Sequence, residues 1–325
     1  MRRRRVIRNL VTGAVAAGLS IRSDAAAQSP SKLGEIPRRV FGKTGERLTV
    51  IGQAGGRFPL ISDEDAIAVT RRALELGINY FDTAASYWDG HSEEIYGQVL
   101  PAARKKVFLT TKSTKRNRRE AETELENSLR RMKTDYVDLW QVHSIQDLED
   151  VDKLFAPGGA IEAFEAAKKA GKCRFIGFTG HRDPYAHLEM LKRYDQWDTI
   201  LMPLHIADPL YLSFEKLVLP VAVQKNLGIQ GMKNFANAKL LQSFSARECL
   251  TYVLSLPIHC TAIGCTTIGQ LEDDVRIAQS LKPLDETQLS ALRKRAENIK
   301  GPMLEDWKKN TDAKTAMLRH EYAGG

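Results

Sequence analysis

The sequence predicts an α/β fold, a (β/α)8 TIM barrel with an N-terminal β-hairpin and a polar C-terminal extension. Eight short apolar segments rich in Val, Ile and Phe alternate with amphipathic segments of helical period, as in the βα units of a parallel sheet. The alternation continues for about 250 residues, the usual length of such a barrel. A doubly wound dinucleotide-binding sheet is the rival fold, but Gly52-Gln-Ala-Gly55-Gly56 has the wrong spacing for its G-x-G-x-x-G turn.

The first expected element is a hairpin at residues 39–49 that turns at residues 43–45. The eight strands are expected at residues 50–54, 79–82, 107–110, 136–141, 175–178, 199–202, 228–231 and 261–264. Helix starts between them carry capping residues: Ser62 before three acids, Asp183 before a proline, and Ser245 with Glu248 three residues later. Gly77 and Gly171 stand where two of the helices should end.

The first 27 residues resemble an export signal, with an arginine-rich start, an apolar stretch at residues 10–21 and three alanines before Gln28. The apolar stretch is too short to cross a bilayer. Arg3-Arg4-Arg5-Val6-Ile7-Arg8 is similar to the twin-arginine export motif, although Arg2 stands where that motif usually has Ser or Thr. A disordered basic tail is the alternative interpretation. We therefore expect contact with twin-arginine export machinery and a periplasmic or otherwise exported protein, or a cytoplasmic one if the leader is not functional.

The expected organisation is an export signal at residues 1–27, a linker at 28–37, the barrel at 38–299 and the extension at 300–325. The formal net charge is +8, yet residues 1–27 hold six arginines and one aspartate, which supply five of those charges. We therefore expect no nucleic-acid partner and no stable membrane insertion. Four scattered cysteines predict neither a disulfide framework nor a zinc site, and no metal is expected.

Reactive groups of such a barrel lie at the C-terminal ends of its strands. The sequence places Asp82 and Tyr87 after the second expected strand, Lys112 after the third and His143 after the fourth. Adjacent strands lie about 4.8 Å apart, so these four side chains can converge. Singly, each has another interpretation: a helix cap, a rim aromatic, a solvated charge or a hydrogen-bonded core residue. Because all four occur at the ends of consecutive strands, we favour chemistry.

The chemistry that suits this set is proton donation. A free phenol has a pKa of about 10, so it donates poorly near neutral pH unless a cation stabilises the phenolate. Lys112 can be that cation, Asp82 can hold it charged, and His143 can orient a polar oxygen opposite Tyr87. Such a group suits protonation of a carbonyl oxygen as hydride reaches the carbon. No side chain donates hydride, so a nicotinamide cofactor is implied.

Four motifs make the sequence resemble the aldo-keto reductases: Phe81-Asp-Thr-Ala-Ala-Ser-Tyr87, Thr111-Lys112-Ser113, Tyr136-Val-Asp-Leu-Trp-Gln-Val-His143 and Gly171-Lys-Cys-Arg-Phe-Ile-Gly-Phe-Thr179. The resemblance runs from Arg39 to about Leu284. It implies a (β/α)8 barrel and a reversible NAD(P)H-dependent reduction of a small-molecule aldehyde or ketone. By this resemblance the four candidate residues occupy the family's catalytic positions, with the tyrosine as general acid.

The resemblance also implies NADP as cofactor and allows NAD. The family's nicotinamide-holding Ser-Asn pair is replaced by Thr179-Gly180-His181, its Gln by Leu201, and its stacking aromatic by Met232-Lys233. The turn after the eighth strand lacks the cations that usually bind the 2′-phosphate, which leaves Arg276 or Lys239 to reach in, so we expect weak discrimination against NAD(H). The residues expected to contact the cofactor are Gly56, Asp82, Thr179, Gly180, His181, Met232, Lys233, Gly264, Thr266, Gln270 and Asp274.

Two other functions stay open at this point. A desolvated Lys112 is a candidate Schiff-base nucleophile of a barrel aldolase, although Asp82 would keep its amine charged. A nicotinamide-binding redox-sensing module with little turnover would keep the same four residues. The substrate is not readable from the sequence, because His205, Trp88 and Trp307 are equally compatible with a pocket lining and with surface or packing roles.

Overall fold

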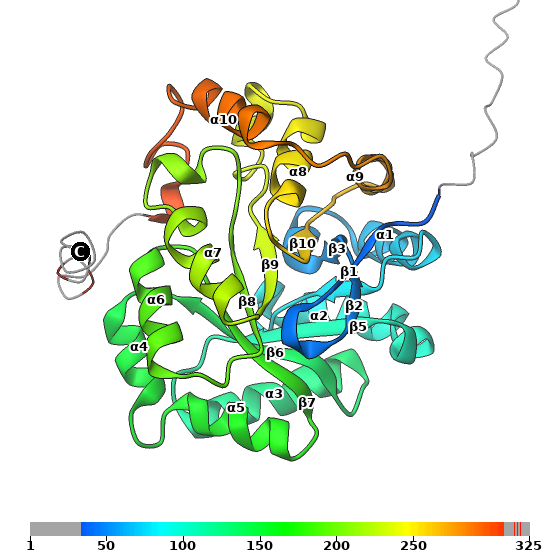
Figure 1. The fold of residues 1–325 in the computed structure, drawn as a ribbon. Helices are drawn as coiled ribbons and strands as arrows, with labels where there is room; N and C mark the ends of the chain where they lie inside the picture. The colour runs from blue at the N-terminus through cyan, green and yellow to red at the C-terminus, as the bar shows by residue number, and fades with distance from the viewer. Residues whose placement is uncertain (1–33, 309–314, 316, 318, 320–325) are drawn as a thin grey trace, which may run out of the picture. The chain divides into compact units, whose positions relative to one another are not determined.

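The computed structural model describes residues 34–308 together with residues 315, 317 and 319, and every structural statement below concerns these residues. The predicted export signal lies outside them. A two-stranded antiparallel hairpin precedes a closed barrel of eight parallel strands in the order β10-β3-β4-β5-β6-β7-β8-β9 (Figure 1). The predicted (β/α)8 barrel with its N-terminal hairpin is therefore confirmed.

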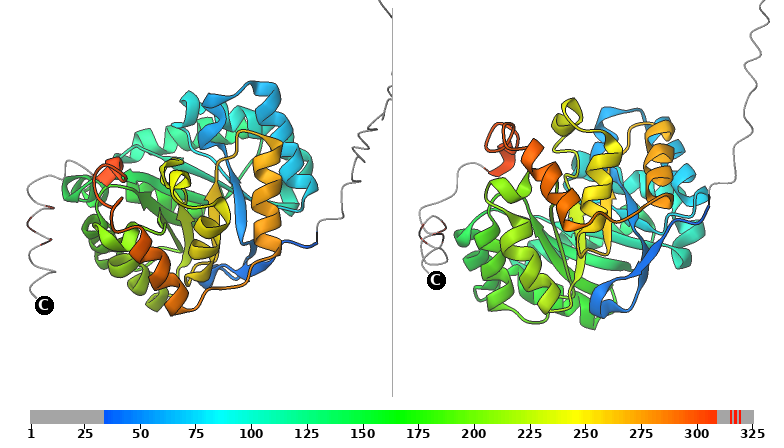
Figure 2. Two further views of the ribbon diagram at one scale, coloured as in Figure 1. Left: turned by 90° about the horizontal axis from the view of Figure 1, so that it is seen from above. Right: turned by 45° about the horizontal axis from the view of Figure 1, so that its top comes forward.

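The hairpin consists of β1 (Arg38–Val40) and β2 (Arg47–Thr49), with a 3-10 turn at Gly42–Thr44. The barrel strands are β3 (Ile51–Ala54), β4 (Tyr80–Asp82), β5 (Phe108–Ser113), β6 (Val137–Ile145), β7 (Cys173–Gly180), β8 (Thr199–Pro203), β9 (Gly228–Met232) and β10 (Cys260–Ile263). The helices are α1 (Asp63–Glu75), α2 (His91–Val99), α3 (Arg118–Met132), α4 (Leu148–Phe155), α5 (Ala160–Lys169), α6 (Pro184–Arg193), α7 (Phe214–Gln224), α8 (Ala246–Ser255), α9 (Ile268–Gln279) and α10 (Glu286–Arg295). Figure 2 shows these helices arranged around the strands.

The predicted helix ends form as the local sequence requires. The side chain of Ser62 accepts from the backbone N–H of Asp65, Asp183 accepts from Tyr185, and Ser245 and Glu248 make a reciprocal capping box. Each of these contacts pairs an amide at a helix start that would otherwise lack a partner. Gly77 and Gly171 take the left-handed conformation just beyond α1 and α5, with φ of 84° and 74°.

The hairpin closes the N-terminal end of the barrel. Phe41 packs edge-on against Phe108 with ring centroids 5.6 Å apart, in a buried cluster that also contains Tyr80 and Cys260. A second, larger cluster fills the space between the strands and the surrounding helices. The closed end makes the barrel a packed core, so the opposite, C-terminal end is left for a site.

Three strands extend by two or more residues beyond the ends that the sequence predicts. The strands β5, β6 and β7 run on to Ser113, Ile145 and Gly180. Their added length places the polar side chains of Lys112, His143 and Thr179 inside strands, where all three are buried. These strand ends therefore carry the polar groups into the barrel mouth on rigid backbone.

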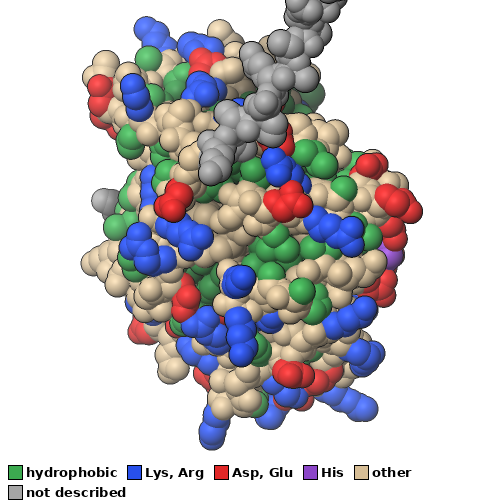
Figure 3. All heavy atoms as spheres, turned by 90° about the vertical axis from the view of Figure 1, so that its right-hand side faces the viewer, with side chains coloured by type: hydrophobic (Ala, Val, Ile, Leu, Met, Phe, Trp, Pro, Cys, Tyr) green, Lys and Arg blue, Asp and Glu red, His purple; other side chains and the backbone are tan. Residues whose placement is uncertain are grey.

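The described surface gives no sign of a concentrated basic patch on the face drawn in Figure 3, where Lys and Arg are interspersed with Asp and Glu. Within the described part of the chain, no helix is both long enough and apolar enough to cross a membrane.

Candidate active site

The four predicted catalytic residues meet at the C-terminal ends of β4, β5 and β6. Asp82 is the last residue of β4, Lys112 and His143 lie on β5 and β6, and Tyr87 follows in the turn after β4. The Lys112 ammonium donates to Asp82 Oδ1 at 2.6 Å and to the carbonyl of Thr83 at 2.7 Å. Burial alone would lower the pKa of Lys112, but Asp82 and Tyr87 together outweigh it and the pKa is raised, so this amine stays charged.

A strained turn holds Tyr87 over this ion pair. Trp88 and Asp89 both take left-handed backbone conformations, with φ of 53° and 51°. The Lys112 nitrogen lies 4.9 Å from the centroid of the Tyr87 ring. A Cβ on Gly56 would lie 3.3 Å from that ring, so a side chain there would crowd it. Burial raises the pKa of Tyr87 and Lys112 opposes that rise, so the hydroxyl is protonated at neutral pH.

His143 faces the tyrosine from β6. Its ring packs edge-on against Tyr87 with centroids 5.5 Å apart, and its Nδ1 lies 3.1 Å from the Ser86 hydroxyl. Burial lowers the pKa of His143 well below its ordinary value, and the nearby cations Lys112 and Arg116 lower it further. The imidazole is therefore neutral, and it can orient an oxygen through an N–H group without protonating it.

The position of His143 is fixed through the main chain as well. Arg116 donates to the carbonyl oxygen of His143 at 2.7 Å and makes a two-point ion pair with Asp150. The next residue, Ser144, has a φ of 56°, and the pairing of β6 with β7 shifts register at this point. The guanidinium thus ties the irregular end of β6 to the start of α4.

The expected nicotinamide contacts gather beside this group. Thr179 and Gly180 end β7, and Met232 ends β9, with the Thr179 hydroxyl 4.0 Å from the Met232 sulfur. Burial, with a contribution from Lys233, lowers the pKa of His181 to about 3. Thr179, His181 and Met232 are therefore uncharged, which suits contact with a nicotinamide ring.

The expected adenosine end lies at the start of α9. Thr267 caps the helix by accepting from the N–H of Gln270, and Gln270 Oε1 accepts from the N–H and hydroxyl of Thr266. Asp274 is buried and accepts from the Cys265 thiol at 3.4 Å, and burial raises the pKa of Asp274 to about 7. The hydrogen bond of Asp274 that the structure describes is thus to another residue of the protein, Cys265.

Two polar residues near this end, Arg57 and Asn237, were not predicted from the sequence. The side chain of Arg57, in the turn after β3, crosses Gly264 so closely that a Cβ on the glycine would lie 2.5 Å from Arg57 Cγ. Arg57 donates to Asn237 Oδ1 at 3.1 Å, and Lys233 donates to the same oxygen at 3.0 Å. Burial and the charge of Arg57 both lower the pKa of Lys233. Two cations therefore converge between the nicotinamide and adenosine ends.

The two cations suggested earlier for the phosphate are engaged elsewhere. Arg276 pairs with Glu272 and Asp273 on its own helix. Lys239 donates to the carbonyls of Met303 and Leu304 and pairs with Asp306.

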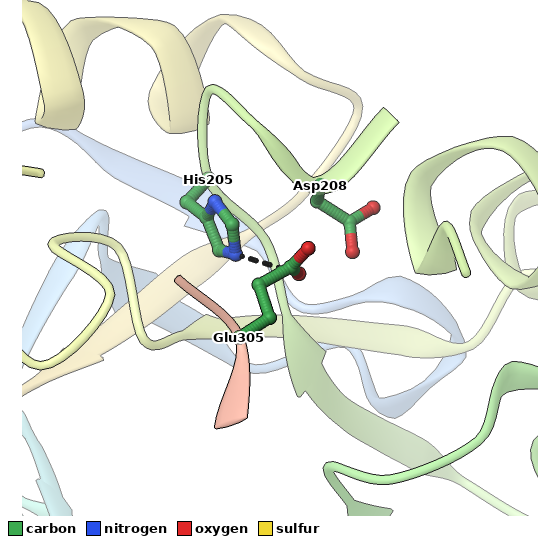
Figure 4. Close-up of side chains that lie close together, drawn as sticks. All are labelled: His205, Asp208 and Glu305. Carbon is green, nitrogen blue, oxygen red and sulfur yellow. Dashed lines mark hydrogen bonds and ion pairs between the residues drawn. The ribbon is translucent and has the colours of Figure 1, made fainter. Parts of the chain in front are cut away.

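A second buried charged cluster joins the C-terminal segment to the loop after β8 (Figure 4). His205, Asp208 and Glu305 offer donor atoms close enough to suggest a metal site. However, His205 Nδ1 accepts from the N–H of Ala207, so Nε2 carries the hydrogen and donates to Glu305 at 3.1 Å. The Lys308 ammonium pairs with both carboxylates and donates to Asp208 at 2.7 Å. The cluster is therefore a buried ion-pair lock centred on Lys308.

The suggested pocket residues have definite surroundings. His205 is fully buried in the lock, and Trp307 packs edge-on against its ring at 6.0 Å. Trp88 packs edge-on against His91 at 4.4 Å. Of the three candidate pocket residues His205, Trp88 and Trp307, His205 therefore has a structural role in the buried cluster.

Comparisons with known proteins show similarity to aldo/keto reductases and other oxidoreductases. Residues 51–248 match the model of the Aldo/keto reductase family. L-galactose dehydrogenase of Arabidopsis thaliana is 32% identical over 163 residues, which cover 45% of this chain and 49% of that relative. The matched part thus spans about half of that relative's length.

Two solved structures share the fold. The holo form of aldo-keto reductase AKR11C1 from Bacillus halodurans superposes with a TM-score of 0.71 at 23% identity and covers 85% of this chain and 100% of that one. An aldo-keto reductase from Klebsiella pneumoniae in complex with NADPH superposes with a TM-score of 0.64 at 23% identity, covering 79% and 94%.

Proposed function

The chain belongs to the aldo/keto reductase family, and on that premise we propose that it reduces aldehyde or ketone carbonyls with NAD(P)H. One observation carries the proposal. A fully buried Lys112–Asp82 ion pair of 2.6 Å lies against the ring of Tyr87 at the open end of the barrel. A buried cation beside a protonated phenol stabilises the phenolate that forms when the phenol gives up its proton.

The four residues divide the reaction between them. When bound, the cofactor supplies hydride to the carbonyl carbon. Tyr87 gives its hydroxyl proton to the carbonyl oxygen, and Lys112 stabilises the phenolate left behind. Asp82 keeps Lys112 charged and in place. His143, neutral and in contact with Ser86, donates a hydrogen bond that holds the carbonyl oxygen next to Tyr87.

The cofactor we propose is NADP(H). We expect the site to discriminate against NAD(H) more weakly than is usual in the family. The NADPH complex of the Klebsiella pneumoniae relative supports this choice. The uncharged side chains of Thr179 and Met232, which are in contact with each other, suit a nicotinamide ring beside them, and the first amides of α9 can bind a phosphate. Arg57 and Lys233 bring two positive charges to the stretch between them, where the pyrophosphate of a dinucleotide would lie.

Tyr87→Phe tests the assignment of the general acid. The variant should lose about 10²-fold or more in kcat for NADPH-dependent reduction across a panel of aldehydes and ketones, because the phenol proton is needed in the transition state. Its affinity for NADPH, measured by fluorescence quenching, should stay close to that of the wild type, because docking does not use this proton. Undiminished turnover in the Phe variant would contradict the mechanism.

The alternative functions are not favoured. A Schiff-base aldolase needs a neutral amine at Lys112, whereas Asp82 keeps the pKa of that amine raised. A redox-sensing module with little turnover has no observation of its own in the described residues.

We also propose that the protein is exported in the folded state. The support is sequence alone: the arginines at positions 3–5 and 8, the apolar stretch at residues 10–21 and the alanines at 25–27, all of which lie outside the described residues.

A further inference from the structure

A row of hydrogen bonds crosses the barrel interior beneath the candidate active site and ends on Asp82. Gln141 of β6 donates through Nε2 to Gln230 Oε1 at 2.9 Å. Gln230 of β9 donates in turn to the Tyr80 hydroxyl at 2.7 Å, and Tyr80 donates to Asp82 Oδ2 at 3.2 Å. Lys112 occupies the other carboxylate oxygen. All five side chains are buried.

The carboxylate fixes the direction of every bond in this row. Asp82 Oδ2 can only accept while it is charged, so the Tyr80 hydrogen points to it. The Tyr80 oxygen must then accept from the NH2 group of Gln230, and the Gln230 carbonyl from the NH2 group of Gln141. Turning the two amides over would leave the hydroxyl pointing away from the carboxylate. The row is thus a set of aligned dipoles with their positive ends toward Asp82.

The packing around Tyr80 fixes the position of its ring. A Cβ on Gly52 of β3 would lie 2.1 Å from Tyr80 Cδ1, so only glycine leaves room for the ring at this point. Burial raises the pKa of Tyr80 well above its ordinary value, so the hydroxyl remains a donor. The row also starts on β6 and β9, which lie two and three strands away from β4 around the closed barrel.

We propose that Tyr80, backed by Gln230 and Gln141, is a positioning residue that sets the charge of the Asp82–Lys112 pair and through it the acidity of Tyr87. The proposal rests on the carbonyl reduction proposed above. The titratable groups that face Asp82 are Lys112 of β5, Tyr80 of β4, Tyr87 of the following turn, Tyr96 of α2 and Cys260 of β10. Of the neutral groups among them, only Tyr80 donates to the carboxylate within the described structure.

Removing the Tyr80 hydroxyl should change the pKa values of both Asp82 and Tyr87, each in a predictable direction. Burial raises the pKa of the Asp82 carboxyl, and Lys112 and Tyr80 both oppose that rise. Without the Tyr80 hydroxyl, Asp82 takes up a proton at higher pH, so the ion pair is lost earlier on acidification. While it is charged, the carboxylate is also no longer partly offset by the Tyr80 hydroxyl dipole, so its negative charge raises the pKa of Tyr87 further. Tyr87 then becomes a weaker acid and ionises at higher pH.

The test is the pH profile of Tyr80→Phe. With NADPH and the aldehyde that the wild type reduces fastest, both limbs of the kcat profile should move to higher pH by about one unit, the effect of one hydrogen bond to a charged group. A purely structural role would lower kcat and leave the limbs in place. Gln230→Met keeps the hydroxyl but frees its direction, so the shift should have the same sign and be smaller.

Tyr96→Phe is the matched control. Tyr96 is also fully buried, and its hydroxyl hydrogen-bonds Gln53 and lies 3.2 Å from the main-chain carbonyl of Asp82, without contact to the carboxylate. Its loss should cost stability without moving either limb. If turnover of Tyr80→Phe is too low to measure, its melting temperature between pH 4 and 7 should begin to fall at higher pH than that of the wild type.

The outcomes separate this proposal from the one it rests on. Limbs of Tyr80→Phe that coincide with the wild type, or an equal shift in Tyr96→Phe, would overturn the role of Tyr80 while leaving carbonyl reduction intact. A wild type that reduces no carbonyl in the panel would remove the proposed function and, with it, this one.

Discussion

At the scale of single residues, Arg57 and Lys233 lie close enough together to form a binding site for an anion. Both donate to the one amide oxygen of Asn237, and each lies within about 3.1 Å of it, so the two charged groups are close neighbours. Like charges held this near to each other repel, and an anion between them removes the repulsion. The pyrophosphate of a nicotinamide dinucleotide carries the right charge, and it is common to NADPH and NADH.

Arg57→Met tests this assignment without turnover. Fluorescence titration should show NADPH and NADH binding weakened by the same factor, about tenfold, because one charge-assisted hydrogen bond is worth about 1.5 kcal/mol. Arg276→Met, which removes a cation already paired on α9, should change neither affinity. A loss confined to NADPH would place Arg57 at the 2′-phosphate and contradict the pyrophosphate assignment. In the wild type, a preference for NADPH beyond about a thousandfold, roughly 4 kcal/mol, would contradict the expected weak discrimination.

The sequence predicts some of these residues and misses others for a physical reason. Asp82, Tyr87, Lys112 and His143 each follow a recognisable strand, so their meeting follows from the order of strands in a barrel. Arg57 lies 180 residues from its partner Asn237, and the contact depends on how the barrel closes between β10 and β3. No local pattern carries that information. The row from Gln141 to Asp82 was missed in the same way, because it crosses the barrel interior between strands that are not neighbours in the sheet.

At the scale of elements, the strand ends show where pattern reading stops working. The sequence predicts that β5 ends at residue 110 and β6 at residue 141, whereas they run on to Ser113 and Ile145. Apolar runs identify buried strands, so a polar residue is interpreted as the start of a loop. In this barrel the last inward positions are Lys112 and His143, which are polar because they belong to the site.

The C-terminal segment is held to the barrel by side-chain contacts. Lys308 donates to Asp208 and to the carbonyl of Tyr211, and it pairs with Glu305, so all three of its hydrogens are used inside the protein. Farther along, Thr315 accepts from the N–H of Leu148, and Arg319 binds Asp183 with two nitrogens. These contacts lie at the loops after β8, β6 and β7, so the segment borders the open end of the barrel.

Lys308→Met should release this segment. The change leaves the carboxylates of Asp208 and Glu305 buried without their cation, at a cost of about 3 to 5 kcal/mol if they stayed in place. Detachment of the segment avoids that cost, so hydrogen exchange at residues 301–308 should speed up at least tenfold, a difference of about 1.4 kcal/mol. The barrel strands should keep their protection. Lys239→Met removes a half-exposed pair with Asp306 and two hydrogen bonds to the carbonyls of Met303 and Leu304, but it leaves no charge buried, so exchange in the segment should speed up by less than in Lys308→Met. Unchanged protection in Lys308→Met would show that the lock does not hold the segment.

At the scale of the whole molecule, the charge of the chain is divided between its parts. Five of the eight formal positive charges belong to residues 1–27, so the basic character of the chain is mainly a property of the leader. This composition fits the export proposed above, whereas a barrel that binds a cofactor needs only local cations such as Arg57 and Lys233. Net charge alone therefore says little about what the folded part binds.

Replacing Arg3 and Arg4 by Lys tests the export proposal while keeping the charge. The precursor should remain in the cytoplasm, because a twin-arginine translocase reads the arginine pair, whereas Arg22→Lys, outside the motif, should leave export intact. Cell fractionation followed by detection of the shortened mature chain in the periplasm measures both. Delivery that stops only when the general secretion pathway is blocked would contradict the twin-arginine route.

The oxidation state of the four free cysteines should depend on whether the chain folds before or after transport. Cys173, Cys249, Cys260 and Cys265 are all buried, and burial raises the pKa of each thiol, to about 12 for the first two. Very little thiolate is present in the folded chain, and thiolate is the species that enters disulfide exchange. A chain threaded unfolded into an oxidising compartment would expose all four thiols to oxidants before the core closed. A chain that crossed already folded would arrive with its thiols shielded, so the number of reduced cysteines in the exported protein records which event came first.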